Sequence, residues 1–364
     1  MKIAHITNQF FPCVGGIEEV VFNLAKKSFF HSEVIALNHC KNLKKKLKKE
    51  ERVKGIRIQR LPFLDLKYYK ICFQIIEKIR NYDLLCIHGI GFFSDLLILT
   101  KFIHRKPIMV ITHGGIFHTR NFSLIKKVYF NFFQRFILRF ADKVLAVSES
   151  DKNIFSKIIP RNKIELIENG FDFKKFYNPN KKRISNKFIF FGRFSKNKRI
   201  DNLIKVFSEL KKGSIDFNLL IVGNDFDNLE KNLKDQIKKL NLNENVKIKS
   251  KVSDKELKKM LDKSTYFVSA SEFEGYGISV LEAMSNGLVP IVNAIAPFRT
   301  ILNKEYGYLV NFSDPVESAR KIKEIMKSKS LHLQYKSEKA KKYSFSKDWS
   351  FVIKQYDKLF SSFV

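Results

Sequence analysis

Short apolar runs alternate with amphipathic stretches along almost the whole chain, and this alternation is the feature that most restricts its fold. Apolar runs of about four to eight residues indicate buried strands, whereas apolar residues at helical spacing indicate amphipathic helices. Strands that alternate with helices form βαβ units, whose strands lie parallel in one sheet. We therefore predict an α/β protein built from mostly parallel sheets.

The predicted strands form two series. In the first half they span 2–7, 33–37, 56–61, 83–87, 108–112, 143–147 and 163–167, with helices predicted between them at, for example, 17–29 and 68–80. In the second half they span 187–191, 218–222, 246–248, 266–269, 289–292 and 308–310. Between the two series lies the polar segment 173–186, which has no period and is expected to be a linker.

A chain of 364 residues is too long for one ordinary core and suits two domains of about 170 residues each. We expect an N-terminal domain, a linker, a C-terminal domain and a C-terminal amphipathic helix that can cross back to the first domain. Their expected bounds are 1–175, 176–186, 187–343 and 344–364.

The four cysteines form no CxxC pair and no histidine cluster stands at metal-ligand spacing; they lie at positions 13, 40, 72 and 86. A zinc site and a disulfide framework are therefore both disfavoured, and we expect a reduced, cytoplasmic protein. Polar residues 7–9 interrupt the N-terminal apolar run, which argues against a secretory signal. Because no window approaches about 18 apolar residues, we expect a soluble or peripheral protein.

The formal net charge is +32, from 68 Lys and Arg against 36 Asp and Glu. A field of this sign attracts polyanions such as nucleic acid, an anionic membrane or a phosphorylated ligand. A generally lysine-rich protein with solvated basic faces would show the same charge, so charge alone does not select a function. The charged run 41–52 is interpreted as a solvated connection.

Two pairs of residues lie in loops between the end of a predicted strand and the start of the next helix. Open α/β sheets bind ligands at such positions. Gly15 and Gly16 would let an anion approach the free N–H groups of a helix, although a tight turn without a ligand explains them equally well. Arg193 and Lys198 follow strand 187–191, and their cations suit a diphosphate.

Two carboxylates, Glu274 and Glu282, flank the start of a predicted helix that Gly277 opens. Carboxylates accept hydrogen bonds from vicinal hydroxyl groups, which suits a sugar and a ribose. The N–H groups at the helix start would face a phosphate between the two carboxylates. Taken alone, a glutamate beside a helix start is usually only a capping charge.

The stretch 274–282 (EGYGISVLE) resembles the signature of the retaining glycosyltransferases of family 4, also called glycosyl transferases group 1. Other segments agree with that family in order and spacing, namely 11–18, 146–148, 168–172, 192–198 and 287–292. The resemblance spans nearly the whole chain. It implies the α/β GT-B fold, in which two Rossmann-like domains, one on the acceptor side and one that binds the nucleotide sugar, face each other across an interdomain cleft.

The resemblance also implies roles for individual residues. Glu274 would contact hydroxyl groups of the donated sugar, and His113 would lie near its anomeric carbon, so that these two form the catalytic pair. The remaining positions would bind the donor's diphosphate and ribose: Gly15, Gly16, Arg193, Lys198, Gly275, Gly277, Ile278 and Glu282. A lone histidine at a strand end is otherwise mostly structural, and His118 is interpreted in that way.

The chain departs from the family pattern in one place. Family members commonly place Gly-Gly-x-x-Glu after the closing strand, where this chain has residues 293–299 (NAIAPFR), so sugar or nucleotide contacts from that loop are in doubt. Asp225 and Asp227 resemble the metal-binding carboxylates of another glycosyltransferase fold, but they fall in a variable turn and are interpreted as coincidental. We expect no metal and no cofactor, because the two cations and the helix start can neutralise the leaving diphosphate.

The expected activity is retaining transfer of a hexose-type sugar from a nucleotide diphosphate sugar to a glycan or lipid-linked acceptor, in the synthesis of a cell-surface polysaccharide or lipopolysaccharide. Front-face attack is the expected route. A sugar-nucleotide epimerase of similar fold is an alternative. A basic nucleic-acid-binding protein is another, but that interpretation requires aromatic residues and Arg clustered in one groove, whereas the lysines here are spread along the chain.

A basic aromatic segment, 119–142, is the candidate for membrane contact. An amphipathic helix of this composition can lie in an anionic interface, although a core helix packed on its own sheet would look similar. In the enzymes that the chain resembles, this region lies near a lipid-linked acceptor. We therefore expect a cytoplasmic enzyme that is peripheral to the inner face of the cell membrane.

Overall fold

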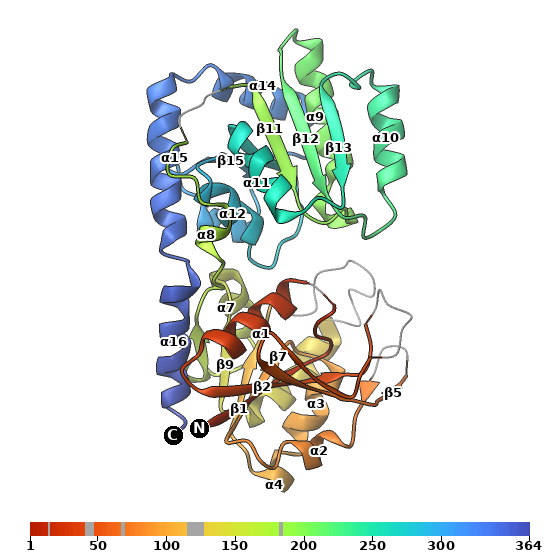
Figure 1. Ribbon diagram of the computed structural model, residues 1–364, viewed down its shortest axis with the longest axis vertical. Coiled ribbons are helices and arrows are strands. Elements are labelled where there is room, and N and C mark those ends of the chain that lie inside the picture. The colour runs from red at the N-terminus through yellow and green to blue at the C-terminus, as the bar shows by residue number, and fades with distance from the viewer. Residues whose placement is uncertain (14, 41–46, 67–69, 115–126, 182–184) are drawn as a thin grey trace. The chain divides into compact units, whose positions relative to one another are not determined.

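The computed structural model describes residues 1–364 except 14, 41–46, 67–69, 115–126 and 182–184. The chain forms two compact units, each with its own sheet and core (Figure 1). The first unit contains Met1–Gly170 together with Trp349–Val364, and the second contains Phe171–Asp348. The divisions thus fall after residues 170 and 348, where the sequence pattern predicts domain ends at 175 and 343.

The sheet of the first unit has the order β10-β9-β8-β7-β1-β2-β4-β3 and is parallel except for β3. The strands predicted from the apolar runs are all present. Their bounds, with β3 added, are Lys2–Thr7 (β1), His31–Leu37 (β2), Glu50–Val53 (β3), Ile56–Leu61 (β4), Leu84–His88 (β7), Ile108–Ile111 (β8), Lys143–Ala146 (β9) and Ile164–Leu166 (β10).

Strand β3 corrects the interpretation of the charged run 41–52 as a connection, of which residues 41–46 lie outside the described part. Residues 50–53 pair antiparallel with β4 and form the edge of the sheet. Lys54 and Gly55, with φ of 50° and 92°, make the tight turn that this hairpin needs. Charged side chains are common on edge strands because they discourage pairing with other chains, so the strand has no apolar signal.

The helices of the first unit lie on both faces of its sheet. They are Gly16–Lys27 (α1), Ile75–Lys78 (α2), Phe92–Leu99 (α3), Lys101–His104 (α4), Arg135–Ile137 (α6), Glu149–Phe155 (α7) and Trp349–Ser361 (α16), with π and 3-10 turns at Tyr129–Gln134 (η1), Leu138–Phe140 (η2) and Arg161–Lys163 (η3). Among the described residues, no helix is both long and apolar enough to cross a bilayer.

The predicted helix 68–80 is wrong. Among the described residues 70–80, residues 70–71 instead form a short strand, β6, that pairs antiparallel with β5 at Leu64–Asp65, and only Ile75–Lys78 (α2) is helical. The misleading pattern comes from Cys72, Ile75 and Ile79, which are buried at helical spacing. Cys72 instead follows the end of the short strand β6, and Ile75 and Ile79 belong to the single helical turn of α2 and its C-cap.

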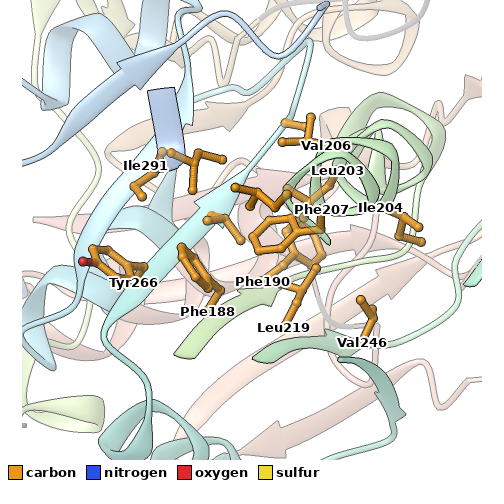
Figure 2. Packing of buried hydrophobic residues seen from close by; sticks show 14 of the residues in the cluster. Phe188, Phe190, Leu203, Ile204, Val206, Phe207, Leu219, Val246, Tyr266 and Ile291 are labelled. Atoms are coloured by element: carbon orange, nitrogen blue, oxygen red, sulfur yellow. The ribbon is translucent and has the colours of Figure 1, made fainter. Parts of the chain in front are cut away.

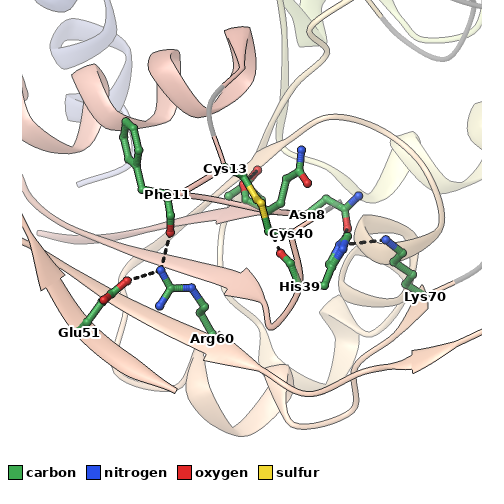
Figure 3. The surroundings of a disulfide bond; sticks show 10 residues. Asn8, Phe11, Cys13, His39, Cys40, Glu51, Arg60 and Lys70 are labelled. Carbon is green, nitrogen blue, oxygen red and sulfur yellow. Dashed lines mark hydrogen bonds and ion pairs between the residues drawn. A yellow bond between two sulfur atoms is a disulfide. The ribbon is translucent and has the colours of Figure 1, made fainter. Parts of the chain in front are cut away.

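A disulfide bond joins Cys13 and Cys40, which corrects the expectation that disulfides are absent (Figure 3). Cys13 follows β1 and Cys40 follows β2, and these strands are parallel neighbours in the sheet. Their following loops therefore emerge at the same edge, which brings the two Cα atoms to 5.7 Å although 27 residues separate them. The cysteine count thus no longer supports a reduced compartment.

Helix α16, at the end of the chain, completes the core of the first unit. Trp349, Val352 and Tyr356 are buried against the sheet face formed by residues such as Leu84 and Met109. The Asp357 carboxylate accepts hydrogen bonds from Ser28 Oγ at 2.5 Å and from the Phe29 amide at 3.3 Å. These contacts tie α16 to the end of α1.

The sheet of the second unit is entirely parallel, with the order β13-β12-β11-β14-β15-β16. Its strands are Lys187–Phe191 (β11), Asn218–Gly223 (β12), Val246–Ser250 (β13), Tyr266–Ser269 (β14), Val289–Asn293 (β15) and Tyr308–Val310 (β16). Its helices are Phe173–Phe176 (α8), Ile200–Lys212 (α9), Glu230–Lys239 (α10), Asp254–Lys263 (α11), Ile278–Ser285 (α12), Ala296–Ile301 (α13), Pro315–Met326 (α14) and Ser330–Phe345 (α15), with a 3-10 turn at Lys196–Lys198 (η4).

Alternate side chains of β11 enter two different cores, as expected for a strand that is covered on both sides. Phe188 and Phe190 pack with α9 and α14 (Figure 2), whereas Ile189 and Phe191 pack with α8, α12 and α13. The predicted linker 173–186 is therefore wrong at its start, because Phe173 and Phe176 of α8 are buried in this second core.

Candidate active site

The strand order of the second unit reverses between β11 and β14. The chain crosses from β11 outward through β12 and β13, then returns to place β14 on the other side of β11. In open α/β sheets, such a reversal of strand order marks the place at the carboxyl ends of the strands where ligands commonly bind. The predicted basic residues lie in the loop after β11 and Glu274 in the loop after β14.

Hydrogen bonds join these two loops directly. Asn197 Nδ2 donates to the Phe273 carbonyl oxygen at 3.0 Å, and the Glu272 amide donates to the Asn197 carbonyl oxygen at 2.9 Å. Arg199 forms an ion pair with Glu272. The loop after β11 and the loop after β14 thus form one connected structure rather than two independent segments.

The Lys198 ammonium and the Glu274 carboxylate meet at this junction. Lys198 Nζ lies 2.5 Å from Glu274 Oε1, and the two side chains are only 12% and 11% exposed. A largely dehydrated ammonium can bind phosphate oxygens, and the carboxylate beside it can accept hydrogen bonds from sugar hydroxyl groups. The structure therefore brings together the two most important predicted residues of this unit.

Arg193 lies in the same loop but has a different partner. Its side chain is exposed, and the guanidinium carbon lies 5.0 Å from the centre of the Phe226 ring. A tight backbone crossing supports the loop. A Cβ atom at Gly223 would overlap the Gly192 carbonyl oxygen and lie 2.9 Å from the carbonyl carbon. Only glycine allows β12 to pass so close to the start of this loop.

Gly277 begins α12 from the left-handed region, with φ of 109°. A Cβ atom there would lie 3.0 Å from the Phe298 ring, so both its conformation and its surroundings require glycine. Gly275 lies just before it in the loop, and Ile278 is the first residue of α12. The positive end of the helix dipole is thus placed at the loop that carries Glu274.

Glu282 lies further along α12 and does not join the Lys198–Glu274 pair. Its Oε1 atom is 3.8 Å from Lys175 Nζ, and that ammonium also lies 3.1 Å from Asp254 Oδ1. The side chain is 18% exposed. The two carboxylates therefore occupy separate positions, Glu274 in the loop before α12 and Glu282 within the helix.

Asp225 and Asp227, interpreted above as coincidental, have structural partners. Asp225 accepts hydrogen bonds from the amides of Leu229 and Glu230, at 2.7 and 3.1 Å, and so caps the start of α10. Asp227 accepts a hydrogen bond from the Lys196 amide at 2.9 Å. Both carboxylates hold loops in place.

In the first unit, Gly15 is the N-cap of α1 and Gly16 its first residue. The segment before them is anchored by Arg60, which donates to the Phe11 carbonyl oxygen at 2.5 Å and pairs with Glu51 (Figure 3). The Cys13–Cys40 disulfide adds a second anchor. No atom lies within 4 Å of a Cβ placed at Gly16 among the described residues, so its backbone can be approached.

His113 follows β8 in the left-handed conformation, with φ of 49°, and is 8% exposed. Asp151 on α7 holds this turn. It accepts hydrogen bonds from the Thr112 hydroxyl and from the Gly114 amide at 3.4 Å. Burial raises the pKa of Asp151, while these hydrogen bonds oppose that shift. Sequence reasoning missed Asp151, although Ser148 is a residue type that caps helices, and its hydroxyl oxygen accepts a hydrogen bond from the Asp151 amide in the first turn of α7.

Sequence reasoning also missed a cluster behind His113. The fold brings together His5 of β1 with Cys86 and His88 of β7, whose potential ligand atoms lie within 4.8 Å of one another. The expectation that no such cluster exists rested on spacing along the chain. His5 and Cys86 are partners across adjacent strands, which sequence spacing does not reveal. His118 lies outside the described residues.

The sequence matches two family profiles that together cover most of the chain. Residues 14–175 match "Glycosyltransferase Family 4", and residues 172–343 match "Glycosyl transferases group 1". A GDP-mannose:cellobiosyl-diphosphopolyprenol alpha-mannosyltransferase of Xanthomonas oryzae pv. oryzae is 32% identical over 325 residues, 88% of this chain and 85% of the relative. The enzyme with the same description from Xanthomonas campestris is 30% identical over 98% of this chain and 95% of its own.

Solved structures of low sequence identity share the fold. Anabaena HepE in complex with UDP-glucose superposes with a TM-score of 0.77 at 18% identity, covering 100% of both chains. The lipopolysaccharide outer core galactosyltransferase WaaB, in its apo form, gives a TM-score of 0.73 at 19% identity, again over 100% of both chains. The two sheets, the matched profiles and these relatives agree, and the chain belongs to the group 1 glycosyltransferases of the GT-B fold.

Proposed function

We propose that this glycosyltransferase moves mannose from GDP-mannose to a saccharide linked to a diphosphopolyprenol, with retention at the anomeric carbon, in the synthesis of a cell-surface glycan. The donor and the acceptor are those that the names of the two Xanthomonas relatives state. The observation that carries the proposal is the Lys198–Glu274 pair at the switch point of the second sheet.

Each site residue then has a chemical role. Arg193 and Lys198 bind the diphosphate, with the start of α12 adding its partial positive charge. Glu274 accepts hydrogen bonds from hydroxyl groups of the mannose, and Glu282 from those of the ribose. The family resemblance assigns Gly15 and Gly16 to the donor phosphates and His113 to the donor sugar, and these three assignments remain predictions.

The reaction breaks the bond between the anomeric carbon and the phosphate oxygen and forms a bond to the acceptor oxygen on the same face. The acceptor's proton passes to the leaving phosphate oxygen, so no separate protein base is required. The developing negative charge on the diphosphate is stabilised by the two cations and the helix start, because such groups are fixed before the reaction begins. We propose on this basis that the reaction needs neither a metal ion nor a cofactor.

The test measures mannose transfer from GDP-mannose to a diphosphopolyprenol-linked cellobiose in the presence of EDTA. Glu274→Gln should lower kcat/KM by about 10²- to 10³-fold, since a charged acceptor in the transition state is lost. The control Glu209→Gln, on α9, changes the same chemistry at an ion pair with Lys212 and should leave the rate unchanged. Full activity of Glu274→Gln, product of inverted configuration, or complete inhibition by EDTA would each contradict the proposal.

A second surface concerns the membrane. Of the predicted segment 119–142, residues 119–126 lie outside the described part, and residues 127–140 are helical. Phe130, Ile137 and Leu138 are buried in the first unit's core. The opposite side carries exposed apolar side chains, as does α4, which Lys101 links to Phe140; the name aromatic patch is used below for these residues, five of which are phenylalanine: Phe102, Ile103, Phe132, Phe133, Phe136 and Phe140. The core-helix interpretation thus holds for the buried side, and membrane contact by the exposed side remains a prediction.

Exposed basic residues accompany the aromatic patch. Arg105, Arg135 and Arg139 are exposed on the same elements, and Lys101 Nζ links α4 to η2 through the Phe140 carbonyl oxygen at 3.1 Å. Exposed aromatic side chains with cations beside them suit an interface of anionic lipids. We propose that this patch holds the enzyme at the inner face of the cell membrane, where a lipid-linked acceptor would be found.

Vesicle co-sedimentation tests the membrane proposal. The double variant Phe132→Ser/Phe136→Ser should bind vesicles of phosphatidylglycerol at least tenfold more weakly, because each buried phenylalanine contributes about 2 kcal/mol. Phe29→Ser is the matched control, since Phe29 is 90% exposed but lies outside the patch. Equal binding of wild type to neutral and anionic vesicles, or no difference between the two variants, would contradict the proposal.

A further inference from the structure

Three buried histidines lie in a row across neighbouring strands of the first unit. His5 is on β1, His88 ends β7, and His113 follows β8, and these strands are adjacent in the sheet. His5 Nδ1 lies 3.0 Å from His88 Nε2, and His88 Nδ1 lies 3.1 Å from His113 Nε2. Both separations are hydrogen-bond distances, so the three rings form a continuous chain.

The number of protons in this chain is restricted by burial. Burial lowers the pKa of His5 to about 3, and it lowers the pKa of His88 well below the usual value, so both rings are neutral at neutral pH. A neutral imidazole carries one N–H group and one acceptor nitrogen. Because His88 uses both nitrogens, it donates one hydrogen bond and accepts the other. The two hydrogen bonds between the three histidines therefore run in the same direction.

The end of the chain at His5 determines that direction. His5 Nε2 is completely buried and has no hydrogen-bond partner among the described residues. If the hydrogen bonds ran from His113 toward His5, this nitrogen would carry a buried N–H group without an acceptor. In the opposite direction it carries only a lone pair. Orphaned buried N–H groups are rare and costly, so the second direction is favoured.

We propose that His5 Nδ1–H donates to His88 Nε2, that His88 Nδ1–H donates to His113 Nε2, and that His113 is thereby held as the neutral tautomer with its proton on Nδ1. His88 is then a positioning residue for His113, and His5 sets the direction of the chain.

The hydrogen-bonded row of histidines complements the contacts made by Asp151. Asp151 fixes the backbone of the turn that carries His113, whereas His88 fixes the imidazole ring itself. The consequence for catalysis rests on the proposed function: an imidazole of fixed tautomer offers a hydrogen-bond donor at Nδ1 without a proton rearrangement. The tautomer itself does not depend on that function, so the two parts can be tested separately.

Nitrogen NMR of the full-length protein, labelled with ¹⁵N-histidine, tests the tautomers directly. At pH 7.5 we expect His5, His88 and His113 all to show a protonated Nδ1 and an unprotonated Nε2, with the His113 signals assigned through His113→Asn. A protonated Nε2 on His113 would overturn the proposal. A stoichiometric transition metal in the purified protein would also overturn it, because the metal would take the lone pairs that the hydrogen bonds require.

Two substitutions of His5 test the direction of the chain. His5→Phe keeps an aromatic ring but removes the donor, so His113 should lose its single tautomer, and kcat should fall by at least about tenfold with little change in KM for the donor. His5→Asn places an amide N–H near the former Nδ1 and should restore both. If His113 kept its tautomer in His5→Phe, the proposal would fail. A wild-type enzyme inactive with GDP-mannose would refute the proposed function alone.

Discussion

Gly223→Ala should damage the cationic loop through a backbone contact. The new methyl group would overlap the Gly192 carbonyl oxygen and lie 2.9 Å from its carbon. Because carbon atoms normally approach to about 3.5–4.0 Å, the start of the loop must move by about 1 Å. Two backbone hydrogen bonds hold the crossing, from the Gly192 amide to the Val222 carbonyl oxygen at 3.0 Å and from the Phe194 amide to the Asn224 carbonyl oxygen at 2.8 Å.

Losing these two bonds costs about 2 kcal/mol, and overpacking adds about 1–3 kcal/mol. We expect the free energy of unfolding of the second unit to fall by about 3–5 kcal/mol, which corresponds to a Tm lowered by roughly 10 °C. Arg193 and Lys198 move with the loop, and a misplacement of about 1 Å can reduce kcat/KM by about 10²-fold.

Calorimetry and the mannose-transfer assay measure these effects. Gly213→Ala is the matched control, because Gly213 ends α9 with φ of −78° and the nearest atom to its Cβ is 3.3 Å away. It should change Tm by no more than about 3 °C, which corresponds to about 1 kcal/mol in a unit of this size. If Gly223→Ala were as stable and as active as Gly213→Ala, the close crossing of the two strands would be refuted.

Three further predictions concern stability. Burial lowers the pKa of Lys181 from 10.5 to about 8, so between these pH values the unfolded state binds more protons than the folded state. The free energy of unfolding, measured by urea denaturation, should therefore rise from pH 8 to 10 by at most about 3 kcal/mol. The variant Lys181→Met should not show this rise. Asp151→Ala should cost about 3–5 kcal/mol in the same assay, because it leaves buried donors unpaired, whereas Asp151→Asn, which keeps one acceptor oxygen, should cost less than half as much. Trp349→Ala should lower the free energy of unfolding by about 3–5 kcal/mol. Circular dichroism is the measurement, because Trp349 is the only tryptophan and the variant has no tryptophan fluorescence. A loss below about 1 kcal/mol would mean that α16 contributes little to stability.

The strands were predictable because parallel strands are covered on both faces and read as apolar runs. Residues 187–191 and 266–269 appear in the structure with the predicted bounds. The edge strand β3 was not predictable in this way, since three of its four residues are charged and only the Lys54-Gly55 turn marks it. In residues 68–80, helical spacing of buried residues misled because a short strand and one helical turn produce the same spacing.

At the candidate site, positions at strand ends were predictable but contacts between them were only partly so. The contact of Lys198 with Glu274 agrees with a shared anion and sugar site. Arg193 lies against Phe226 and Glu282 near Lys175, and neither partner is indicated by spacing along the chain. The histidine row and the disulfide depend on which strands are neighbours, and this information lies in the sheet order rather than in any local motif.

The position of α16 has a consequence for how the protein is made. The first 170 residues leave the ribosome long before residues 349–361, yet these last residues cover one face of the first sheet. Until then, the part of that face that α16 covers lacks its helix and only α1 packs beside it among the described helices of this cluster, whereas the second unit can already be complete. The order of completion during synthesis is therefore the reverse of the order in the sequence, and the nascent first unit is the species that chaperones must protect.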